Sequence, residues 1–496
     1  MEKFNYSHVQ RYFLFDSSNM TAYIKNQIMG VRDQKISLIN RTMNTMKRNC
    51  NIEYISLGEI DQIGASCHYL RLGDWGLLLD AGADPHGKER SGYPRYDLIA
   101  GEPVNAIIIT HAHLDHLGSL PVAIRYFPHA RIYMTPATAA LSEIMLFHYL
   151  KVQEKKARQN LKKFEPPYLS EEVEHLLYMF QSFDYEFPFK IHGFQESEID
   201  ITFWDAGHIL GSAGVEIRWR GRRFFYTGNT KKSSQFILKG ARYPGNSEIL
   251  LTEATYGDNE EASHIKKQTE VKRFGNFISE CLNFGGAVLI PVFALGRTQE
   301  IMMLLNRLIG RNQVPAVPVY LTGMGIQINR IYDRLLHKIY PQYDARLLRT
   351  ITADTLQSKN FRKPSIVVST SGMMMPNTLS FEIAGEFMQD PRNGIALVGW
   401  ADPETPGGSL RAGKVEKIKE VFGIDRVLSR IETFYFSAHS HRQDLLRMIE
   451  HINPKKTMLC HGERNALEWM KKKLQELNLG GKVIIPEKER KITLPG

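Results

Sequence analysis

Residues 110–116, which read Thr-His-Ala-His-Leu-Asp-His, constrain this chain more than any other stretch of the sequence. They follow the apolar residues 106–109, a run that is too short for a helix and rich in β-branched side chains, as is typical of a buried parallel strand. Open α/β sheets bind their ligands at the C-terminal ends of such strands. Imidazole and carboxylate groups bind zinc-like ions, and four of them in one turn exceed what one tetrahedral ion takes from a single loop. The segment therefore predicts two metal ions that share this loop.

Length and composition predict a globular protein with more than one domain. The chain has 496 residues, too many for one hydrophobic core, so two or three domains are expected. No apolar run approaches the roughly 18 residues of a spanning helix, and the first residues lack the apolar stretch of a signal peptide, so no membrane association is expected. Four cysteines (Cys50, Cys67, Cys281 and Cys460) lie far apart, which favours reduced thiols in a cytoplasmic protein.

The charge balance suits a polyanionic partner. The net charge is +10, from 63 Lys and Arg against 53 Asp and Glu. Basic clusters occur at residues 155–158, 162–163, 231–232, 266–267 and 471–473. Each cluster by itself is more typical of a solvated surface, so only the net excess supports the interpretation.

Strand and helix patterns divide the chain into two kinds of region. From residue 52 short strands and turns alternate, with paired strands expected around Gly73-Asp74 and a helix expected at 120–127. After Gly257 a strand–helix rhythm predicts a second α/β domain. Its strands are expected at residues 287–290, 317–321, 365–369 and 395–398. From about residue 427 we expect one more strand pair and then a final helix over 464–477.

Further polar residues follow predicted strands. His208, Asn229, His439 and His461 each lie close after such a strand. A single histidine at a strand end is more often a hydrogen-bonded structural residue than a ligand. Four such ends beside residues 110–116 favour one shared site.

The order of these segments resembles the metallo-β-lactamase superfamily and, within it, the β-CASP nucleases. The matching motifs are, in order, Asp80, residues 111–116, His208, Asn229, Glu253, His439 and His461. Residues 291–300 and 369–374 resemble two further signatures of the family. The resemblance covers residue 52 to the end, and it is strongest to the endonuclease subunit of the cleavage and polyadenylation machinery and its prokaryotic relatives.

The resemblance implies an α/β fold, in which a metallo-β-lactamase αββα sandwich carries an inserted β-CASP α/β domain. The sandwich would take residues 52–257 and 429–496, and the β-CASP domain residues 258–428. Residues 1–51 would form an N-terminal extension of one or two helices without an assigned role.

The family pattern also implies two zinc ions. His111, His113 and His208 would hold the first ion, and Asp115, His116 and His461 the second. Two ions roughly 3.5–4 Å apart can clamp a scissile phosphate and activate water, so Asp115 would also take part in catalysis. Asp80 would orient a ligand imidazole or the nucleophile.

His439 is the expected general acid for the leaving 3′ oxygen, and Glu253 would fix its tautomer. The alternative for His439 is a structural role.

Substrate contacts are expected from two loops. Gly296 and Arg297 open a predicted helix, where backbone N–H groups and a guanidinium suit a phosphate. Ser371 and Gly372 could do likewise, with loop packing as the alternative. A cleft between the domains would admit only a single strand. In this family a histidine at the position of His461 accompanies RNA substrates, although DNA is left open.

The implied function is therefore a zinc-dependent endoribonuclease that hydrolyses phosphodiester bonds of single-stranded RNA. It would act in the cytoplasm, as a homodimer or as a subunit of a processing complex. The alternatives are a non-catalytic RNA-binding scaffold subunit and a single-strand DNA nuclease.

The sequence departs from the family pattern at two positions. Asn229 stands where relatives have an Asp that bridges both metals, and a neutral amide oxygen is a weaker ligand, so the second zinc site would be weak. Three interpretations are open: a deliberate Asp→Asn change that disables cleavage, a natural Asn with one loosely held metal, or a degenerate relative that binds RNA without cutting it. His441 replaces an Asp that supports the loop around His439, and it offers an extra ligand or a phosphate contact.

Overall fold

The computed structural model describes residues 51–84, 92–159, 166–191, 198–260, 264–339, 351–352 and 361–495. Residues 1–50, with the helices expected there, and the basic cluster at 162–163 lie outside the described residues. By its internal contacts the chain divides into two units, one of Met1–Ile52 with Thr493–Gly496 and one of Glu53–Ile492. The second unit contains every predicted site residue.

The first sheet contains the strand of the histidine-rich loop. In chain order its strands are β1 (Ile52–Ser56), β2 (His68–Leu72), β3 (Trp75–Leu79), β4 (Ala106–Ile108), β5 (Arg131–Met134), β6 (Phe180–Ser182) and β20 (Ile492–Leu494). β2 and β3 form the predicted antiparallel hairpin, and β3 to β6 are parallel. All three residues of β4 are buried, so the prediction of a buried parallel strand before the loop is confirmed.

Helices cover this sheet on one side. They are α2 (Leu114–Leu117), α3 (Leu120–Tyr126), α4 (Pro136–Gln159) and α5 (Ser170–Leu177), with a 3₁₀ turn, η2, at Tyr96–Ile99. The apolar residues of α3, α4 and α5 share one buried cluster with Ile107 and Ile132 of the sheet. The predicted helix at 120–127 is confirmed.

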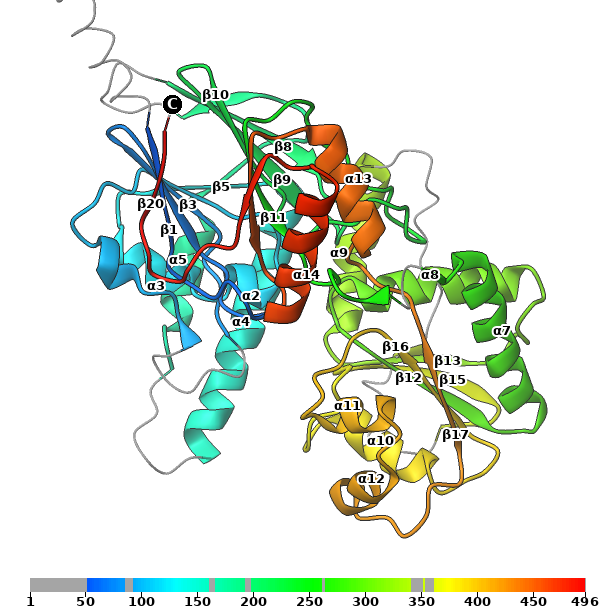
Figure 1. Ribbon diagram of the computed structural model, residues 1–496. Coiled ribbons are helices and arrows are strands. Elements are labelled where there is room, and N and C mark those ends of the chain that lie inside the picture. Colours follow the sequence, from blue (N-terminus) through cyan, green and yellow to red (C-terminus); the bar gives the residue numbers. More distant parts are fainter. Residues whose placement is uncertain are drawn as a thin grey trace, which may run out of the picture. The chain divides into compact units, whose positions relative to one another are not determined.

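The second sheet contains the other predicted metal-site strands. Its order is β19 (Lys482–Ile484), β18 (Lys456–Cys460), β11 (Ile249–Glu253), β10 (Arg222–Tyr226), β9 (Ala213–Trp219), β8 (Ile199–Asp205) and β7 (Phe189–Ile191). Figure 1 shows α13 (Arg442–Ile452) and α14 (Arg464–Glu476) beside this sheet. The two sheets with their helices form the expected sandwich.

The third sheet is built entirely between β11 and β18. Its order is β14 (Ile351–Thr352), β13 (Val319–Thr322), β15 (Ser365–Thr370), β12 (Ala287–Val292), β16 (Gly394–Val398) and β17 (Arg430–Phe434), all parallel. Its helices are α7 (Lys267–Asn283), α8 (Arg297–Gly310), α9 (Gly325–Ile339), α10 (Leu379–Phe387), α11 (Pro406–Arg411) and α12 (Val415–Phe422).

Both faces of the third sheet are covered, which explains why its strands are continuous apolar runs. In β12, Val288 and Ile290 belong to the cluster that contains α7 and α8, whereas Ala287 and Leu289 pack with α10. Figure 1 shows α7 and α8 on one side and α10 to α12 on the other. The predicted second α/β domain is confirmed.

The predicted strand pair after residue 427 is wrong. β17 joins the third sheet beside β16, whereas β18 joins the second sheet between β11 and β19. The sequences of β17 and β18 each predict a strand, but neither sequence indicates which sheet its strand belongs to. The short strands β5, β6 and β7 were not predicted, because each has only three or four residues and, unlike the segment before His111, none stands in an uninterrupted aliphatic run.

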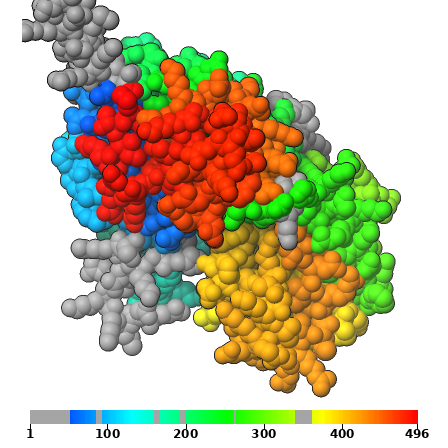
Figure 2. Space-filling model, viewed as in Figure 1, coloured from blue at the N-terminus to red at the C-terminus, as the bar shows by residue number. Residues whose placement is uncertain are grey.

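The C-terminal segment closes on the start of the second unit. Lys488 donates to Glu59 at 2.6 Å, and Ser56 bridges to Lys488 in the backbone. In Figure 2 the red C-terminal residues accordingly lie against blue residues.

The thiols match the prediction where they are described. Cys67, Cys281 and Cys460 are buried and free, and Cys50 lies outside the described residues. In the part of the chain that the structure describes, no helix is long and apolar enough to cross a membrane.

The buried carboxylate of Glu300 connects α8, the helix that follows β12, to the loop 236–238 of the sandwich. Glu300 in α8 is 2% exposed and accepts hydrogen bonds from the backbone N–H groups of Phe236, Ile237 and Leu238. Burial raises the pKa of Glu300, and the three donors compensate for part of that cost. This contact fixes the loop that follows Asn229 against α8.

We expect Glu300→Ala to destabilise the fold by about 3 kcal/mol or more, because three buried N–H groups lose their acceptor. Urea unfolding followed by circular dichroism measures the effect as a lower midpoint. The exposed Glu420 of α12 supplies the control, since Glu420→Ala should change stability by no more than about 0.5 kcal/mol. Equal midpoints for the two variants would show that the Glu300 contact does not hold the loop.

Candidate metal centre

The histidine-rich loop follows β4 and turns directly into α2. His113 is the N-cap of α2, so Asp115 and His116 lie in its first turn. His111 and His116 are fully buried, and Asp115 is partly exposed. A strand end followed at once by a helix start thus brings four potential ligands into one short segment.

The second sheet supplies the remaining predicted ligands from strand ends. His208 follows β8, Asn229 follows β10 and His461 follows β18. His461 has a φ of 49°, a left-handed conformation that a non-glycine residue adopts at some cost and that recurs at functional sites.

Two groups of donor atoms result. One consists of His111, His113 and His208, and the other of Asp115, His116 and His461; within each group the donor atoms lie within 4.8 Å of one another. These groups coincide with the two predicted ligand sets. His113 Nδ1 lies 3.1 Å from His208 Nε2, and His116 Nε2 lies 3.2 Å from His461 Nε2.

Each imidazole is fixed by a hydrogen bond from its outward nitrogen to an oxygen. The acceptors are Thr110 Oγ1 for His111, Leu295 O for His113, Asp80 Oδ2 for His116, Ala438 O for His208 and Thr255 Oγ1 for His461. Such bonds orient each ring and direct its other nitrogen toward the neighbouring ligands. His111 Nε2 is buried and has no hydrogen-bond partner among the described residues.

Asp80 organises the two sheets at this point. Its carboxylate is fully buried and accepts bonds from Thr110 N at 2.8 Å, Thr110 Oγ1 at 3.0 Å, His116 Nδ1 at 2.7 Å and Tyr226 Oη at 2.9 Å. Tyr226 belongs to the second sheet, whereas the other partners follow β4 of the first. Of the two predicted roles for Asp80, the geometry shows the orientation of a histidine.

The lowered pKa values of the first group's histidines favour the neutral form of imidazole, which can bind a metal. Burial lowers the pKa of His111 and His208 well below the ordinary value, and that of His113 to about 4. Neutral imidazole is the form that binds a metal. In the second group burial would raise the pKa of Asp115, but the nearby His116 and His461 hold it well below its usual range.

Asn229 is held beside these groups. Its side chain is 2% exposed, and its Oδ1 has no hydrogen-bond partner within the described ranges. The loop is fixed on both sides: a Cβ at Gly228 would lie 2.9 Å from Thr110, and Thr230 N donates to Glu253 at 2.5 Å. A buried amide oxygen without a donor is one that a cation or a water can use.

His439 and Glu253 form a hydrogen-bonded pair next to the ligands. His439 Nδ1 lies 2.8 Å from Glu253 Oε2, and the His439 ring centroid lies 4.6 Å from that of His208. Burial would raise the pKa of Glu253, but interaction with His439 holds it below its usual value. The pair leaves Nε2 of His439 available.

A pocket of about 280 Å³ adjoins His439. Four cationic residues line it, which we call the cation pocket: Lys231, Lys267, Arg297 and Arg411. Among the described residues that line it, none is Asp or Glu. Burial lowers the pKa of Lys231 to about 8, as expected where positive charge gathers away from water.

Arg297 differs from the other three cations of this pocket, because it interacts with Glu300 electrostatically but without a hydrogen bond. Its side chain is 8% exposed, and its guanidinium has neither a hydrogen bond nor an ion pair within the described part of the chain. Gly296 has a structural role, because its N–H donates to the side chain of Gln299. A Cβ at this position would lie 2.5 Å from Ile209. The guanidinium, and not the N–H of Gly296, is therefore free for an anion.

The other predicted substrate residues, His441, Ser371 and Gly372, do not lie together in one pocket. His441 lines the cation pocket but also caps α13 by accepting from Asp444 N, and it belongs to neither donor group. Gly372 lines a different recess, and Ser371, at φ 90°, accepts from Ser380 Oγ through its carbonyl.

Sequence reasoning missed several residues around the centre. Lys231 belongs to a cluster interpreted as solvated, yet its Nζ donates to His439 O at 3.0 Å. Its position two residues after Asn229 was the available signal. Thr110 and Thr255 were also missed, because a threonine that bridges a carboxylate and an imidazole has no distinctive spacing.

The donor set fits a metal ion. Imidazole nitrogens from three histidines converge in the first group, and two imidazole nitrogens converge with a carboxylate in the second. The fold and this centre define a member of the metallo-β-lactamase superfamily.

Sequence comparisons agree. Residues 60–267 match the metallo-beta-lactamase superfamily, residues 298–410 the Beta-Casp domain and residues 424–486 the Zn-dependent metallo-hydrolase RNA specificity domain. An RNase J-like protein of Methanocaldococcus jannaschii is 31% identical over 419 residues, covering 82% of this chain and 91% of that protein. Within the superfamily, this chain belongs to the β-CASP family.

Two further proteins extend the comparison. Endoribonuclease YSH1 of Candida glabrata is 28% identical over 455 residues, which are 87% of this chain but only 57% of that protein. The crystal structure of a protein of unknown function from Enterococcus faecalis has a TM-score of 0.54 and covers 90% of this chain and 100% of its own. At 14% identity the latter similarity concerns the fold alone.

Proposed function

We propose that this chain is a zinc-dependent ribonuclease that hydrolyses phosphodiester bonds of single-stranded RNA. The observation that carries the proposal is the position of the two donor groups directly beside the cation pocket, with His439 adjoining both. A centre for metal ions next to an anion-binding pocket is what hydrolysis of a phosphodiester requires.

Two zinc ions would be held by this chain's own residues. His111, His113 and His208 would hold one, and Asp115, His116 and His461 the other. When bound, zinc supplies Lewis-acid stabilisation of phosphate charge and lowers the pKa of water. Asp80 positions His116 for this role through the 2.7 Å hydrogen bond to Nδ1.

His439 would donate a proton to the leaving 3′ oxygen. Glu253 holds its Nδ1, so Nε2 is the nitrogen that can transfer a proton to substrate. Glu253 is itself held by Thr230 N and by Thr255 Oγ1, each at 2.5 Å, so the ring orientation is fixed before substrate binds.

The cation pocket would hold substrate phosphates. The unpaired guanidinium of Arg297 can form a bidentate contact with a phosphate, and Lys231 adds a second positive charge on the side of His439. The net charge of +10 favours the same polyanion.

RNA is favoured over DNA by similarity. One relative's name describes an endoribonuclease and another an RNase J-like protein, and residues 424–486 match an RNA specificity domain. His461, which carries the motif associated with RNA substrates in the family, lies within those residues. Internal cleavage, as the YSH1 name describes, is part of the proposal.

Asn229 favours a second candidate function, a subunit that binds RNA without cutting it. A neutral amide in place of a bridging carboxylate would weaken the second zinc site. The intact donor groups and the fixed His439–Glu253 pair support the catalytic proposal over this candidate.

Chelation tests the proposed function. We expect purified protein to cleave single-stranded RNA, to lose activity in a chelator and to regain it when Zn²⁺ is added back, because the donor groups can hold the metal. A matched single-stranded DNA run in parallel should be cleaved more slowly. Cleavage of RNA by metal-free protein would exclude the proposed mechanism, and faster cleavage of DNA would exclude the proposed substrate.

His439→Ala should lower kcat by about 10²- to 10⁴-fold with little change in bound zinc, because the protein would lose its proton donor but keep both donor groups. Glu253→Gln should also lower kcat, because His439 would lose its carboxylate partner. Single-turnover cleavage and elemental analysis measure the two quantities. The exposed His129→Ala serves as the matched control with unchanged kcat. A His439→Ala protein with control-level activity would assign His439 a structural role.

A further inference from the structure

Two aromatic side chains lie exposed at one edge of the third sheet. β12 and β16 are parallel neighbours that end at Val292 and Val398. Phe293 follows β12 at once, and Trp400 lies two residues beyond β16. The carboxyl edge of a parallel sheet is where such folds bind ligands.

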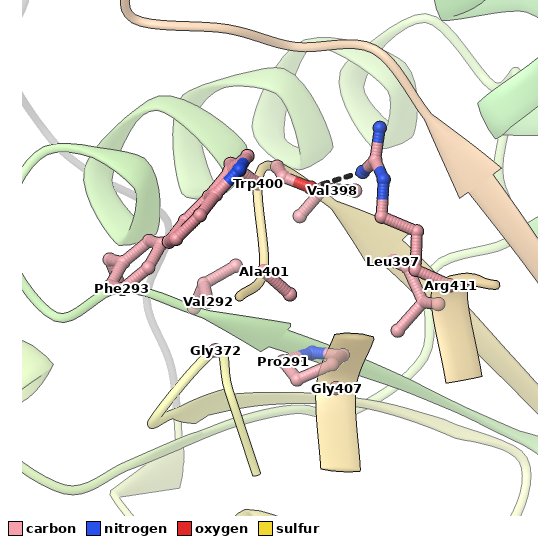
Figure 3. A pocket seen from close by; sticks show the side chains of 11 residues that line it. Pro291, Val292, Phe293, Gly372, Leu397, Val398, Trp400, Ala401, Gly407 and Arg411 are labelled. Atoms are coloured by element: carbon pink, nitrogen blue, oxygen red, sulfur yellow. Dashed lines mark hydrogen bonds between the residues drawn. The ribbon is translucent and has the colours of Figure 1, made fainter. Parts of the chain in front are cut away.

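Phe293 and Trp400 line one recess together with Gly372 and Arg411. We call this the aromatic recess. Figure 3 shows the two aromatic side chains along one side of it and Arg411 on the other. Phe293 is 38% exposed and Trp400 is partly exposed, so neither ring is fully buried in the hydrophobic core.

The recess is shallow. Its volume is about 10 Å³, room for a single water, so an occupant would lie across the aromatic rim and not inside. Glycines make its floor: a Cβ at Gly372 would lie 3.2 Å from Phe293 N, and a Cβ at Gly407 would lie 3.0 Å from Gly372 O. The close packing at Gly372 gives a structural reason for a glycine in the segment 369–374, because a side chain there would press against the backbone of Phe293.

The aromatic recess is continuous with the cation pocket. Gly399 and Arg411 line both. Arg411 donates to the carbonyl of Gly399 and stacks over the ring of Tyr435 at 5.3 Å, so its charge is fixed between the two. None of the described residues that line the recess is Asp or Glu.

From this arrangement we infer that Phe293 and Trp400 form a stacking subsite for one nucleobase of the strand whose phosphates occupy the cation pocket. A flat ring suits a shallow aromatic rim, and the adjoining fixed guanidinium suits the phosphate of the same strand. The inference rests on the proposed function, since it assigns a base-binding site to that substrate. It places this base on the side of the cation pocket where Arg411 lies.

The test uses single-stranded RNAs of about 12 nucleotides, each with one abasic residue at a different position. For the wild-type protein we expect KM to rise about tenfold at one position, which corresponds to loss of one stacked base. Trp400→Ala should raise KM for intact RNA by a similar factor and abolish the penalty at that position alone. Trp400→Phe should restore both. Phe293→Ala should act in the same direction, whereas Phe284→Ala, a 73% exposed control, should not.

Several outcomes overturn the inference. If KM is unchanged in Trp400→Ala, or if the abasic penalty at that one position persists in the variant, the rings bind something else, such as an apolar side chain of a partner protein or of a second copy. If the wild-type protein cleaves no RNA, the proposed function fails. The same abasic series measured by fluorescence anisotropy then decides the subsite by itself, since stacking changes Kd without cleavage.

Discussion

Five imidazole rings, four of them buried and one partly buried, are in mutual contact between two sheets, and the rest of the centre depends on how each ring is held. Such a cluster is stable only if both nitrogens of every ring have a partner, one on the outer side and one, such as a metal ion or another ligand, on the inner side. Thr110, Leu295, Asp80, Ala438 and Thr255 supply the outer partners. They come from distant parts of the sequence, so the ring orientations require the folded sandwich and the inserted sheet together.

Asp80 shows how the two sheets of the sandwich are coupled at the centre. It accepts from Tyr226 of β10 in one sheet and from His116 after β4 of the other. The third sheet is coupled in the same region, because Leu295, between β12 and α8, accepts from His113 and Glu300 holds the loop 236–238. The segment 291–297 therefore links all three features: Leu295 contacts a metal-site histidine, Arg297 lines the cation pocket, and Phe293 lines the adjoining aromatic recess.

Much of this was predictable from local patterns. The apolar run before His111, the hairpin at Gly73-Asp74 and the strand–helix rhythm after Gly257 each have a period that a single sequence reveals. The grouping of ligands followed from similarity and not from spacing. The sheet assignments of β17 and β18, the buried position of Lys231 and the commitment of Gly296 N–H to Gln299 were not predictable, because they depend on contacts between distant segments.

The side chain of Asn229 is 2% exposed, and its Oδ1 has no donor among the described residues. We propose that this amide limits zinc binding at the second donor group, Asp115, His116 and His461, of an otherwise intact phosphodiesterase. The most direct measurement is zinc per chain by elemental analysis, with RNA cleavage, for this chain and for Asn229→Asp side by side. We expect the Asn229→Asp protein to bind close to two zinc ions, more than this chain does, and to cleave RNA faster. Equal zinc content and equal cleavage in the two proteins would contradict it.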